Sequence, residues 1–404
     1  MPQATGVFKT LALKRESTYG TVAGASGAQL MRRVTSDLAL TKQTYQSNEI
    51  RPDQQVADFR HGVRGVEGTL AGELSPGAYS DLISAALRRD FTAGVSATSL
   101  SITIAGSGPT YTVTRASGSW LTDGFKRGRV VRLTAGAFNA ANLNNNLLIQ
   151  SMTATVLTVL VLNGSALSAQ GPIASATCAV VGKDTFAATS GHTNISYTAE
   201  HWFADVAQSE VFTGVQPTKV DIGLPPTGIA TVSIPVVGKD IVTATSQYFS
   251  SPSAVTTGGI CAAVNGVVLL GGTAVAVLTG LSFSIDSARS ADPVVGSNTL
   301  LTRFAGRITV SGQATVYFED ATLRDAFVNE TPVELIVVLT SDNTAASGFV
   351  GFTLPRVILG GAGKGDGQTG IVQTHPFTAT LPTTGGAGIA NDLSTISVQD
   401  SAAA

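Results

Sequence analysis

"GRITVSGQATVYFEDATLRDAF", residues 306–327, predicts a β-strand followed by a short helix, and it has a counterpart in "GVRGVEGTLAGELSPGAYSDLI", residues 62–83. When the two are aligned without gaps, Val66 lies on Val310. Apolar and polar residues alternate along both copies, as in an antiparallel strand that packs one face and exposes the other. The repeat therefore predicts two copies of one β-module in the chain.

A short amphipathic helix should follow each of these strands and cover the apolar face of its sheet. The first is expected to begin at Ser75-Pro76, because serine is a good N-cap and proline suits the first helical position. The second is expected to be capped near Asp320, with Leu323 and Phe327 facing the sheet.

The similarity extends beyond the strand and helix, which supports an internal duplication. The further pairs are 37–42 with 281–286, the long polar loops 43–62 and 287–306, and 218–240 with 333–361. The order strand, long loop, strand, helix, strand and hairpin strand thus occurs twice. Loops of this length are unusual as plain connections and are more often functional.

The divisions that follow from the repeat include one segment that only the first copy contains. They are an N-terminal arm (1–35), a first module (36–97 and 183–240), an inserted β-domain (98–182), a connecting hairpin (241–277), a second module (278–385), and a C-terminal strand and tail (386–404). The insertion has short β-like runs divided by Gly- and Asn-rich turns, typical of a small sandwich or barrel. Since whole domains are tolerated at exposed loop tips, it should project from the surface.

Two features of these divisions leave alternatives open. In the connecting hairpin, an apolar run raises the question of a membrane helix, but Asn265-Gly266 is a strong hairpin signal and favours a buried or interface hairpin. In the insertion, Tyr111 and Trp120 suit either a carbohydrate-binding surface or, as is more usual in small β-domains, the packed core.

Composition excludes several classes of function. The chain has 404 residues, 44 Gly and only 13% charged residues, which favours β-modules over long helices. A net charge of -2 without clustered Lys and Arg argues against tight nucleic-acid binding. Cys178 and Cys261 are far apart and are expected to be apolar core residues. The first residues lack the apolar region of a secretory signal, so folding in a reducing cytoplasm is expected.

No motif in the sequence indicates an active site, a cofactor site or a metal site. "LPTTG" at 381–385 matches a sortase signal, but no apolar span or basic tail follows it. The glycine-rich stretch 360–370 lacks the Ser or Thr of a phosphate loop and is interpreted as a flexible loop. The four histidines show no metal spacing, and His201 beside Trp202 is interpreted as a packed or interface pair. The protein is therefore not expected to be an enzyme.

The repeated stretches, together with "KRESTYGT" near the N-terminus, "YTAEHWFADVAQSEVFTGVQPTKVDIGLPPTGIATVSIPVVGKD" and "FTLPRVIL", resemble the tail tube (major tail) proteins of long-tailed bacteriophages. The resemblance implies a mainly β fold: a duplicated β-sandwich or barrel module with a flanking helix, plus an inserted small all-β domain. It also implies that neighbouring sheets join into closed rings, which stack into a tube for genome delivery.

The same resemblance implies the partners and the location. The partners are other copies of this chain, a tape-measure protein, tail completion proteins and double-stranded DNA that passes without specific binding. The location is the virion tail, after assembly in the host cytoplasm and without membrane insertion. Because six modules are needed around a ring and this chain carries two, homotrimeric rings with pseudo-sixfold symmetry are favoured over the alternative, homohexamers.

The polar strand faces and the long loops supply candidate site residues. The lumen-facing candidates are Glu67, Thr69, Glu73, Ser311, Gln313 and Thr315; alternatively these form the solvated face of an ordinary two-layer domain. The candidates for contacts between stacked rings are Gln46, Asn48, Glu49, Arg51, Asp53, Asp58, Arg60, Arg289, Asp292 and Arg303. A second hypothesis is a virion or cell-surface adhesin or decoration protein, in which the inserted β-domain binds a host surface.

Overall fold

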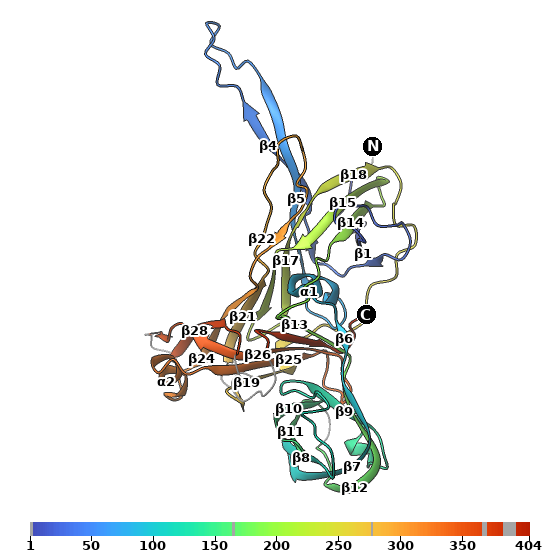
Figure 1. Cartoon of the computed structure of the whole chain (residues 1–404), viewed down its shortest axis with the longest axis vertical. Helices are drawn as coiled ribbons and strands as arrows, with labels where there is room; N and C mark the ends of the chain where they lie inside the picture. Colours follow the sequence, from blue (N-terminus) through green and yellow to red (C-terminus); the bar gives the residue numbers. More distant parts are fainter. Residues whose placement is uncertain (1–2, 164–165, 276–277, 366–369, 383–392) are drawn as a thin grey trace.

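A computed structural model describes residues 3–163, 166–275, 278–365, 370–382 and 393–404. It confirms a mainly β chain that contains a small closed barrel. Figure 1 shows a central body of sheets, a long two-stranded arm that projects from one end, and the barrel at the other end.

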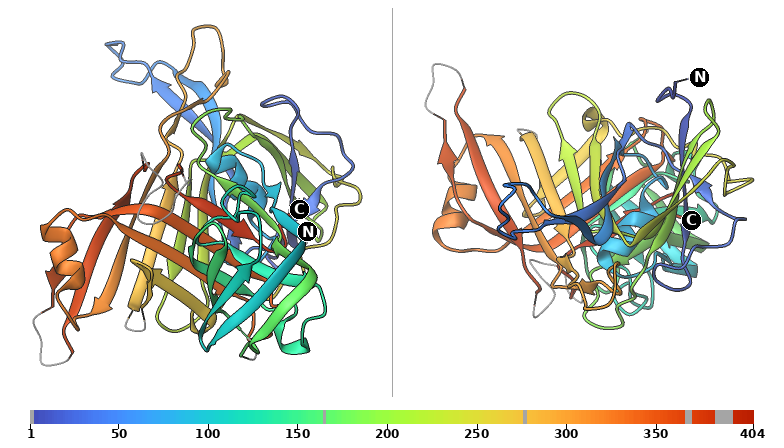
Figure 2. Two further views of the ribbon diagram at one scale, coloured as in Figure 1. Left: turned by 60° about the horizontal axis from the view of Figure 1, so that its bottom comes forward. Right: turned by 90° about the horizontal axis from the view of Figure 1, so that it is seen from above.

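One continuous antiparallel sheet runs across both copies of the repeat. Its strands, in spatial order, are β3 (Thr35–Ser36) with β4 (Ala39–Gln46), β5 (Phe59–Glu73), β17 (Thr231–Gly238), β16 (Lys219–Leu224), β21 (Leu278–Asp286), β24 (Thr309–Tyr317), β28 (Val372–Ala379) and β27 (Gly363–Lys364). Figure 2 shows the later strands of this sheet side by side, from yellow-green through gold to orange-red. We call it the tube sheet.

β5 and β24 occupy equivalent places in the sheet, which shows the duplication directly. β5 lies between β4 and β17, and β24 lies between β21 and β28. Gly68 and Gly312 occupy the same position in the two copies. A Cβ on Gly68 would lie 2.6 Å from the Cα atom of Leu38, and one on Gly312 would lie 2.7 Å from the Cβ atom of Phe283. Leu38 therefore takes the place of Phe283, so the expected alignment of 37–42 with 281–286 is wrong by one residue.

The expected match of 218–240 with 333–361 is also wrong. The hairpin β16–β17 lies beside β5, and its counterpart beside β24 is β27–β28. The segment 333–361 instead forms β25 (Val333–Thr340) and β26 (Phe349–Leu359), which correspond to β14 (Tyr197–Phe203) and β15 (Gln208–Pro217). The mismatch arose because β27 is glycine-rich and lacks the alternating apolar residues that mark β16.

The remaining strands form the layers behind the tube sheet. They are β1 (Lys9–Arg15), β2 (Gln29–Leu30), β6 (Thr92–Ala93), β13 (Lys183–Phe186), β18 (Asp240–Ala244), β19 (Gly266–Leu270), β20 (Thr273–Ala274) and β29 (Ser397–Asp400), and a separate pair is formed by β22 (Arg289–Ser290) and β23 (Phe304–Ala305). A single hydrophobic core joins both copies; its members include Leu70, Val220, Ile234, Phe283, Val310, Leu335 and Phe352. The two copies thus share one core, because the apolar faces of both halves pack together.

The two helices are covered to very different extents. In α1 (Ser80–Leu87) every residue except Asp81 is buried. It begins later than the expected Ser75-Pro76 start, because a turn with Gly77 at φ +75° precedes it. In α2 (Thr322–Val328) no residue is buried, and Phe327 and Val328 are 36% and 67% exposed. The expectation that each helix covers a sheet face is met by α1 and only partly by α2.

The connecting segment turns at a different place from the one expected. Asn265 ends a short 3-10 turn, and Gly266 begins β19, which pairs with β25. The hairpin turn lies at Gly271 and Gly272, both of which have positive φ values. Glycine adopts such values without strain, so the turn forms at these two glycines and not at Asn265.

The inserted barrel has its own core. Its strands are β7 (Ser96–Ser107), β8 (Thr110–Arg115), β9 (Val130–Ala135), β10 (Leu147–Met152), β11 (Val156–Val161) and β12 (Gln170–Val180), and a 3-10 turn (Ala140–Asn142) precedes β10. Trp120 and Tyr111 are buried inside it, and the Trp120 indole nitrogen donates to the Thr155 carbonyl at 3.0 Å. These aromatic rings are core residues and do not form a carbohydrate-binding surface. Cys178 in this core and Cys261 in the main core are buried free thiols, as expected.

The barrel is fixed to the second copy by an apolar contact and by buried polar groups. The apolar contact consists of Val130, Leu148, Leu160, Leu269, Ile336, Val338 and Phe349. Beside it, Arg127 forms a 2.6 Å ion pair with the buried Glu334. The Gln399 side chain accepts from the Val130 N–H at 2.8 Å and donates to the Val130 carbonyl at 2.9 Å.

Replacing Arg127→Ala is expected to lower the free energy of unfolding by about 3 kcal/mol at pH 8, and by less at pH 5. Burial raises the pKa of Glu334 from 4.5 to about 7. The folded chain therefore binds the proton of the Glu334 carboxyl group more tightly than the unfolded chain does. The stability that this protonation contributes to the folded state is lost as the pH rises from 4.5 to about 7. Above that range the buried carboxylate depends on Arg127. Denaturant unfolding at both pH values measures the difference. Arg324→Ala, which removes an exposed ion pair, is the control; an equal cost of Arg127→Ala at both pH values would contradict the argument.

Candidate functional site

The tube sheet has one polar face, and it carries all six lumen-facing candidates. They are Glu67, Thr69 and Glu73 on β5, and Ser311, Gln313 and Thr315 on β24. Each is exposed or half-buried, whereas the strand residues of the opposite parity, such as Leu70, Gly72 and Ala314, face the core or approach the next strand. The alternation read from the sequence therefore placed these side chains together on one surface of the folded chain.

Strand register extends this polar face across both copies. Ser311 lies opposite Ser284 on one side and opposite Thr378 on the other. Ser284 lies opposite Asp221, which in turn lies opposite Ser233. Short hydroxyl and carboxylate side chains thus form a row across five adjacent strands.

The polar face carries more acidic than basic groups. Lys219 is the only Lys or Arg among β16, β17, β21, β24, β28 and residues 66–73 of β5, all of which the structure describes. Its ammonium group forms a 2.7 Å ion pair with Asp221, and Lys219 lies opposite Asp286 in the ladder. Neither Glu67 nor Glu73 forms an ion pair with another described residue. Electrostatics therefore favours repulsion of polyanions from this face.

A shallow groove of about 540 Å³ follows the polar face across the joint between the two copies. Its polar lining includes Lys219, Asp221, Ser282, Ser284, Ser311, Gln313 and Thr378. The groove shows that the surface is hollowed where β16 meets β21. Such a shape suits one part of a larger concave wall.

The long loop 43–62 is mainly a two-stranded arm. β4 and β5 continue to pair as far as Gln46 opposite Phe59, and the tip projects well beyond the body (Figure 1). The arm carries the stacking candidates Gln46, Asn48, Glu49, Arg51, Asp53, Asp58 and Arg60, all of them exposed. A two-stranded hairpin exposed on both faces has little stability of its own.

Charged groups on the arm pair with one another. Arg51 lies 3.1 Å from Asp53, and Arg60 lies 2.7 Å from Asp58. Hydrogen bonds from these guanidinium groups lower the pKa of Asp53 and of Asp58. Exposed pairs of this kind contribute little to stability.

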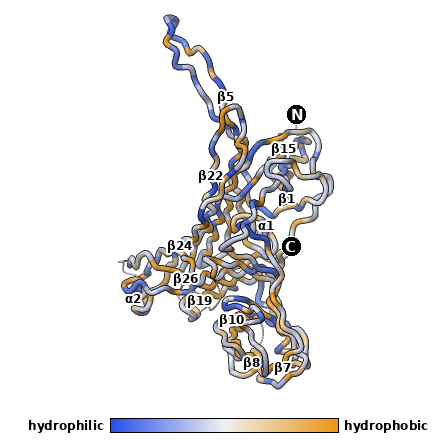
Figure 3. Tube along the Cα trace, in the orientation of Figure 1, coloured by the Kyte–Doolittle hydropathy of each residue, from blue (hydrophilic) through white to orange (hydrophobic). Residues whose placement is uncertain are grey.

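The arm also carries apolar side chains that the sequence analysis did not single out. Ile50 is 98% exposed, and Tyr45, Val56 and Phe59 are each more than half exposed. Figure 3 shows hydrophobic positions among the hydrophilic ones along this arm. Isolated apolar residues within a polar loop were the signal that could have identified them. They give the arm apolar side chains that are exposed in the isolated subunit.

The second long loop, 287–306, behaves differently and lies against the base of the arm. Its Asn298 carbonyl accepts from the Arg64 N–H at 2.9 Å. The Arg303 guanidinium is buried and donates to the Gly238 carbonyl at 2.8 Å. Arg289 donates to the carbonyls of Pro217 and Ala85, both at 3.0 Å, and burial lowers its pKa to about 10.

These positions separate the stacking candidates of the second loop. Arg289 and Arg303 are engaged inside their own subunit, so their location does not suit a contact between rings. Asp292 is exposed and remains a candidate. The sequence could not distinguish an anchoring arginine from a surface arginine, because both occur in the same polar context.

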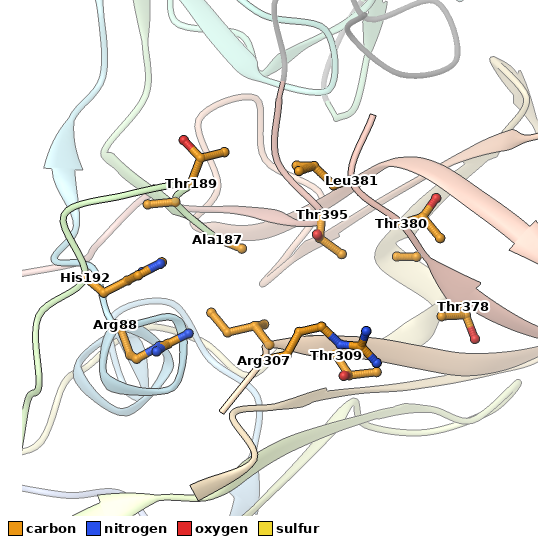
Figure 4. Close-up of a pocket in the computed structure, with 13 residues that line it drawn as sticks. Arg88, Ala187, Thr189, His192, Arg307, Thr309, Thr378, Thr380, Leu381 and Thr395 are labelled. Carbon is orange, nitrogen blue, oxygen red and sulfur yellow. The ribbon is translucent and has the colours of Figure 1, made fainter. Parts of the chain in front are cut away.

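A pocket of about 590 Å³ opens beside the end of β24 and β28 (Figure 4). Arg88, His192 and Arg307 supply basic groups, and the hydroxyl-bearing lining residues are Thr189, Thr309, Thr378, Thr380 and Thr395. In Figure 4, Arg88 and His192 approach from one side and Arg307 from the other. No acidic residue is among the described residues that line it.

His201 is packed in the core, as the sequence analysis favoured. Its Nε2 atom lies 2.6 Å from the Ser36 hydroxyl, and its Nδ1 atom lies 3.7 Å from the Glu210 carboxylate. Burial lowers the pKa of His201 to about 3, so the ring is neutral at ordinary pH. Ser36 and His201 are both buried, so this contact ties strands together within the subunit.

The described part of the chain contains no group of three or more His, Cys, Asp and Glu side chains arranged for a metal ion. In the same residues, no helix is long and apolar enough to cross a membrane. Lys364 in the glycine-rich stretch stacks over the Phe318 ring, 3.7 Å from its centroid. Most of "LPTTG" and residues 366–369 of the glycine-rich stretch lie outside the described residues.

Comparison with known proteins identifies the family. No curated protein matches the chain. The family described as phage tail tube protein matches residues 9–379, which cover most of the sequence and include both copies of the module and the inserted barrel. The chain therefore belongs to the phage tail tube protein family, a structural component of the virion tail.

Proposed function

We propose that this chain polymerises as stacked rings into a hollow tube, and that the polar face of the tube sheet lines the channel through which the genome passes. The observation that carries this proposal is the continuous sheet with one acidic, polar face that spans both copies of the module. DNA slides along such a surface, because no cluster of Lys or Arg pairs with its phosphates. Double-stranded DNA is thus a transient passenger without specific binding.

We propose a homotrimer as the ring. Each chain contributes eight strand positions to the tube sheet, from β3/β4 to β27. Three chains then close a barrel of about 24 strands, with a backbone diameter of about 48 Å at a spacing of about 4.8 Å and a tilt of about 40°. Side chains that project into the channel narrow its diameter to roughly 35 Å, which admits one DNA duplex. A homohexamer, the alternative, doubles the backbone diameter to about 96 Å, far more than one duplex needs.

The arm and the exposed part of the second loop supply the proposed contacts between rings. Gln46, Asn48, Glu49, Arg51, Asp53, Asp58 and Arg60 lie on the arm, and Asp292 lies on the second loop. The channel-lining residues are Glu67, Thr69, Glu73, Ser311, Gln313 and Thr315. A tape-measure protein and tail completion proteins are the further partners, and assembly takes place in the host cytoplasm.

The domain division proposed from the sequence is kept with these assignments. The inserted domain 98–182, between the two parts of the first module, is placed on the outside of the tube. Its barrel docks on β25 and β26, and those strands lie behind the tube sheet, away from its polar face. Trp120 and Tyr111 are buried in the barrel core, so these two rings do not supply a carbohydrate-binding surface for the adhesin alternative.

The mass of one ring tests the proposed assembly. Purified protein is expected to form rings or tubes with a central channel in electron micrographs. Native mass spectrometry of single rings should give three times the chain mass of 41.2 kDa. A mass of six chains would show that the ring is the homohexamer. A protein that stays monomeric under all polymerising conditions would contradict the proposed tube.

A further inference from the structure

We propose that ring closure joins β27 of one copy to the outer edge of β3–β4 of the next copy, as antiparallel strands with Gly363 opposite Ala39 of the next copy. This inference rests on the proposed ring and names the contact that closes it. The occupant of each free edge is thus a second copy of this chain, in one defined register.

The register follows from a joint that the chain already contains. Where the two copies of the module meet, β16 pairs with β21 over six residue pairs, from Lys219 opposite Asp286 to Leu224 opposite Leu281. This joint connects the last strand of one module to the first strand of the next. A ring of equivalent modules needs the same joint between the second module of one copy and the first module of its neighbour.

The position of β27 in that joint is fixed through β17 and β28. Val236 lies opposite Gly68, and Phe377 lies opposite Gly312, so β28 follows β17 with a constant offset. Ser233 on β17 therefore corresponds to Thr374 on β28. Asp221 lies opposite Ser233, and Gly363 lies opposite Thr374. Gly363 consequently takes the place of Asp221.

The position of β4 is fixed in the same way through β5 and β24. Glu67 on β5 corresponds to Ser311 on β24. Ala39 lies opposite Glu67, and Ser284 lies opposite Ser311. Ala39 therefore takes the place of Ser284, and since Asp221 faces Ser284 in the internal joint, Gly363 should face Ala39 of the next copy.

Both edges are free within the described part of the subunit. β4 pairs only with β5, and β27 pairs only with β28. β27 has only two residues, Gly363 and Lys364, and both its shortness and its lysine are features that protect an exposed strand edge. The edge is thus protected from indiscriminate pairing and selects a partner that fits closely.

The exposed helix α2 supports the same joint. α1 is buried because it packs against β16 and β21, the two strands of the internal joint, as well as against its own module. The equivalent strands beside α2 are β27 and β4 of the next copy. Arrival of the next copy therefore places Leu38 and Leu40 near Phe327 and Val328, which are 36% and 67% exposed in the isolated subunit.

The pocket in Figure 4 marks a further surface that the next copy should cover. Its residues on β24 and β28 correspond to Gly65 and Gly238 in the first module and to their neighbours. In the first module this place is covered by the second loop, through the Arg303 contact with Gly238 and the approach of Leu300 to Gly65. The matching element of the next copy is the base of its arm.

Disulfide cross-linking tests the register. The variant with Ala39→Cys and Gly363→Cys should form covalent trimers when assembled protein is oxidised. A Cβ at Gly363 meets no atom within 4 Å, and the native Cys178 and Cys261 are buried, so neither strain nor native thiols should interfere. Directly opposed strand positions have the Cα separation that a disulfide needs. The expected yield is at least about tenfold above that of Thr41→Cys with Gly363→Cys, which is shifted by two residues.

The internal joint supplies the positive control. Asp221→Cys with Ser284→Cys should form a disulfide within one chain, because these residues already face each other. If rings form and the internal control links but the Ala39 and Gly363 pair does not, the proposed register is wrong while the tube stands. Efficient linking of the shifted pair would also overturn the register. Failure of unmodified protein to form rings would instead overturn the proposed function.

Discussion

Replacing residues 47–58 with an Asn-Gly turn is expected to give a folded subunit that no longer polymerises into tubes. The segment lies beyond the last paired residues of the arm, Gln46 and Phe59, and the described structure shows it exposed throughout apart from the half-buried Ser47. Its removal therefore leaves the core unchanged, and an Asn-Gly turn suits a two-residue hairpin connection. The proposed contact between rings, however, loses the apolar side chains of Ile50 and Val56 and the exposed candidates Asn48, Glu49, Arg51, Asp53 and Asp58.

Sedimentation and electron microscopy measure this loss of polymerisation, while thermal unfolding measures the fold. The melting temperature should stay close to that of the unmodified chain. Removing the exposed ion pair by Arg51→Ala with Asp53→Ala is the matched control, and it should leave tubes intact because an exposed ion pair contributes little. Tubes of ordinary length from the shortened arm would show that the arm does not join rings.

Replacing Glu67→Lys and Glu73→Lys together is expected to leave tubes intact but to reduce infectivity at least about tenfold. Both side chains lie on the polar face of β5, outside the core, so the fold tolerates the change. Every copy in the tube then presents two new cations to the passing duplex. Because each phosphate paired with lysine adds affinity, the effects accumulate along the channel and retard the DNA.

Plaque titre and DNA release from purified particles measure this effect, and electron micrographs confirm that the tails are of normal length. Glu67→Gln with Glu73→Gln is the control, because it removes the same negative charges without adding cations. This control should retain most of the infectivity. Raising the salt concentration should partly restore DNA release in the lysine variant, since salt weakens phosphate contacts. Normal infectivity of the lysine variant would place β5 away from the channel.

The duplication was readable from the sequence because strand alternation survives in β5 and β24. The glycines at 68 and 312 also survive, since a side chain at either position would collide with the neighbouring strand. The hairpin β27–β28 was missed because β27 has only two residues, Gly363 and Lys364, and these carry no alternation to recognise. In the proposed ring, this edge strand pairs through its backbone with a strand of the next copy, so it does not require apolar side chains.

The candidate channel residues were found from the parity of the strands, since every second residue of an antiparallel strand lies on the same face. The two long loops were less predictable. They have similar length and polarity, yet 43–62 extends as an arm while 287–306 folds against the body. The difference depends on Arg289 and Arg303, whose hydrogen bonds go to carbonyls that only the folded chain brings near.

The barrel is carried by only one of the two modules in each chain, and this has a consequence for the outer surface. In the proposed ring, modules with and without an inserted barrel alternate around the circumference. Neighbouring barrels are therefore twice as far apart as they would be if every module carried one. One barrel for every two modules, docked on the second copy of its own chain, thus keeps the crowding on the outer surface low. The outer surface between neighbouring barrels stays uncovered, which leaves room for the tube to bend without steric collision.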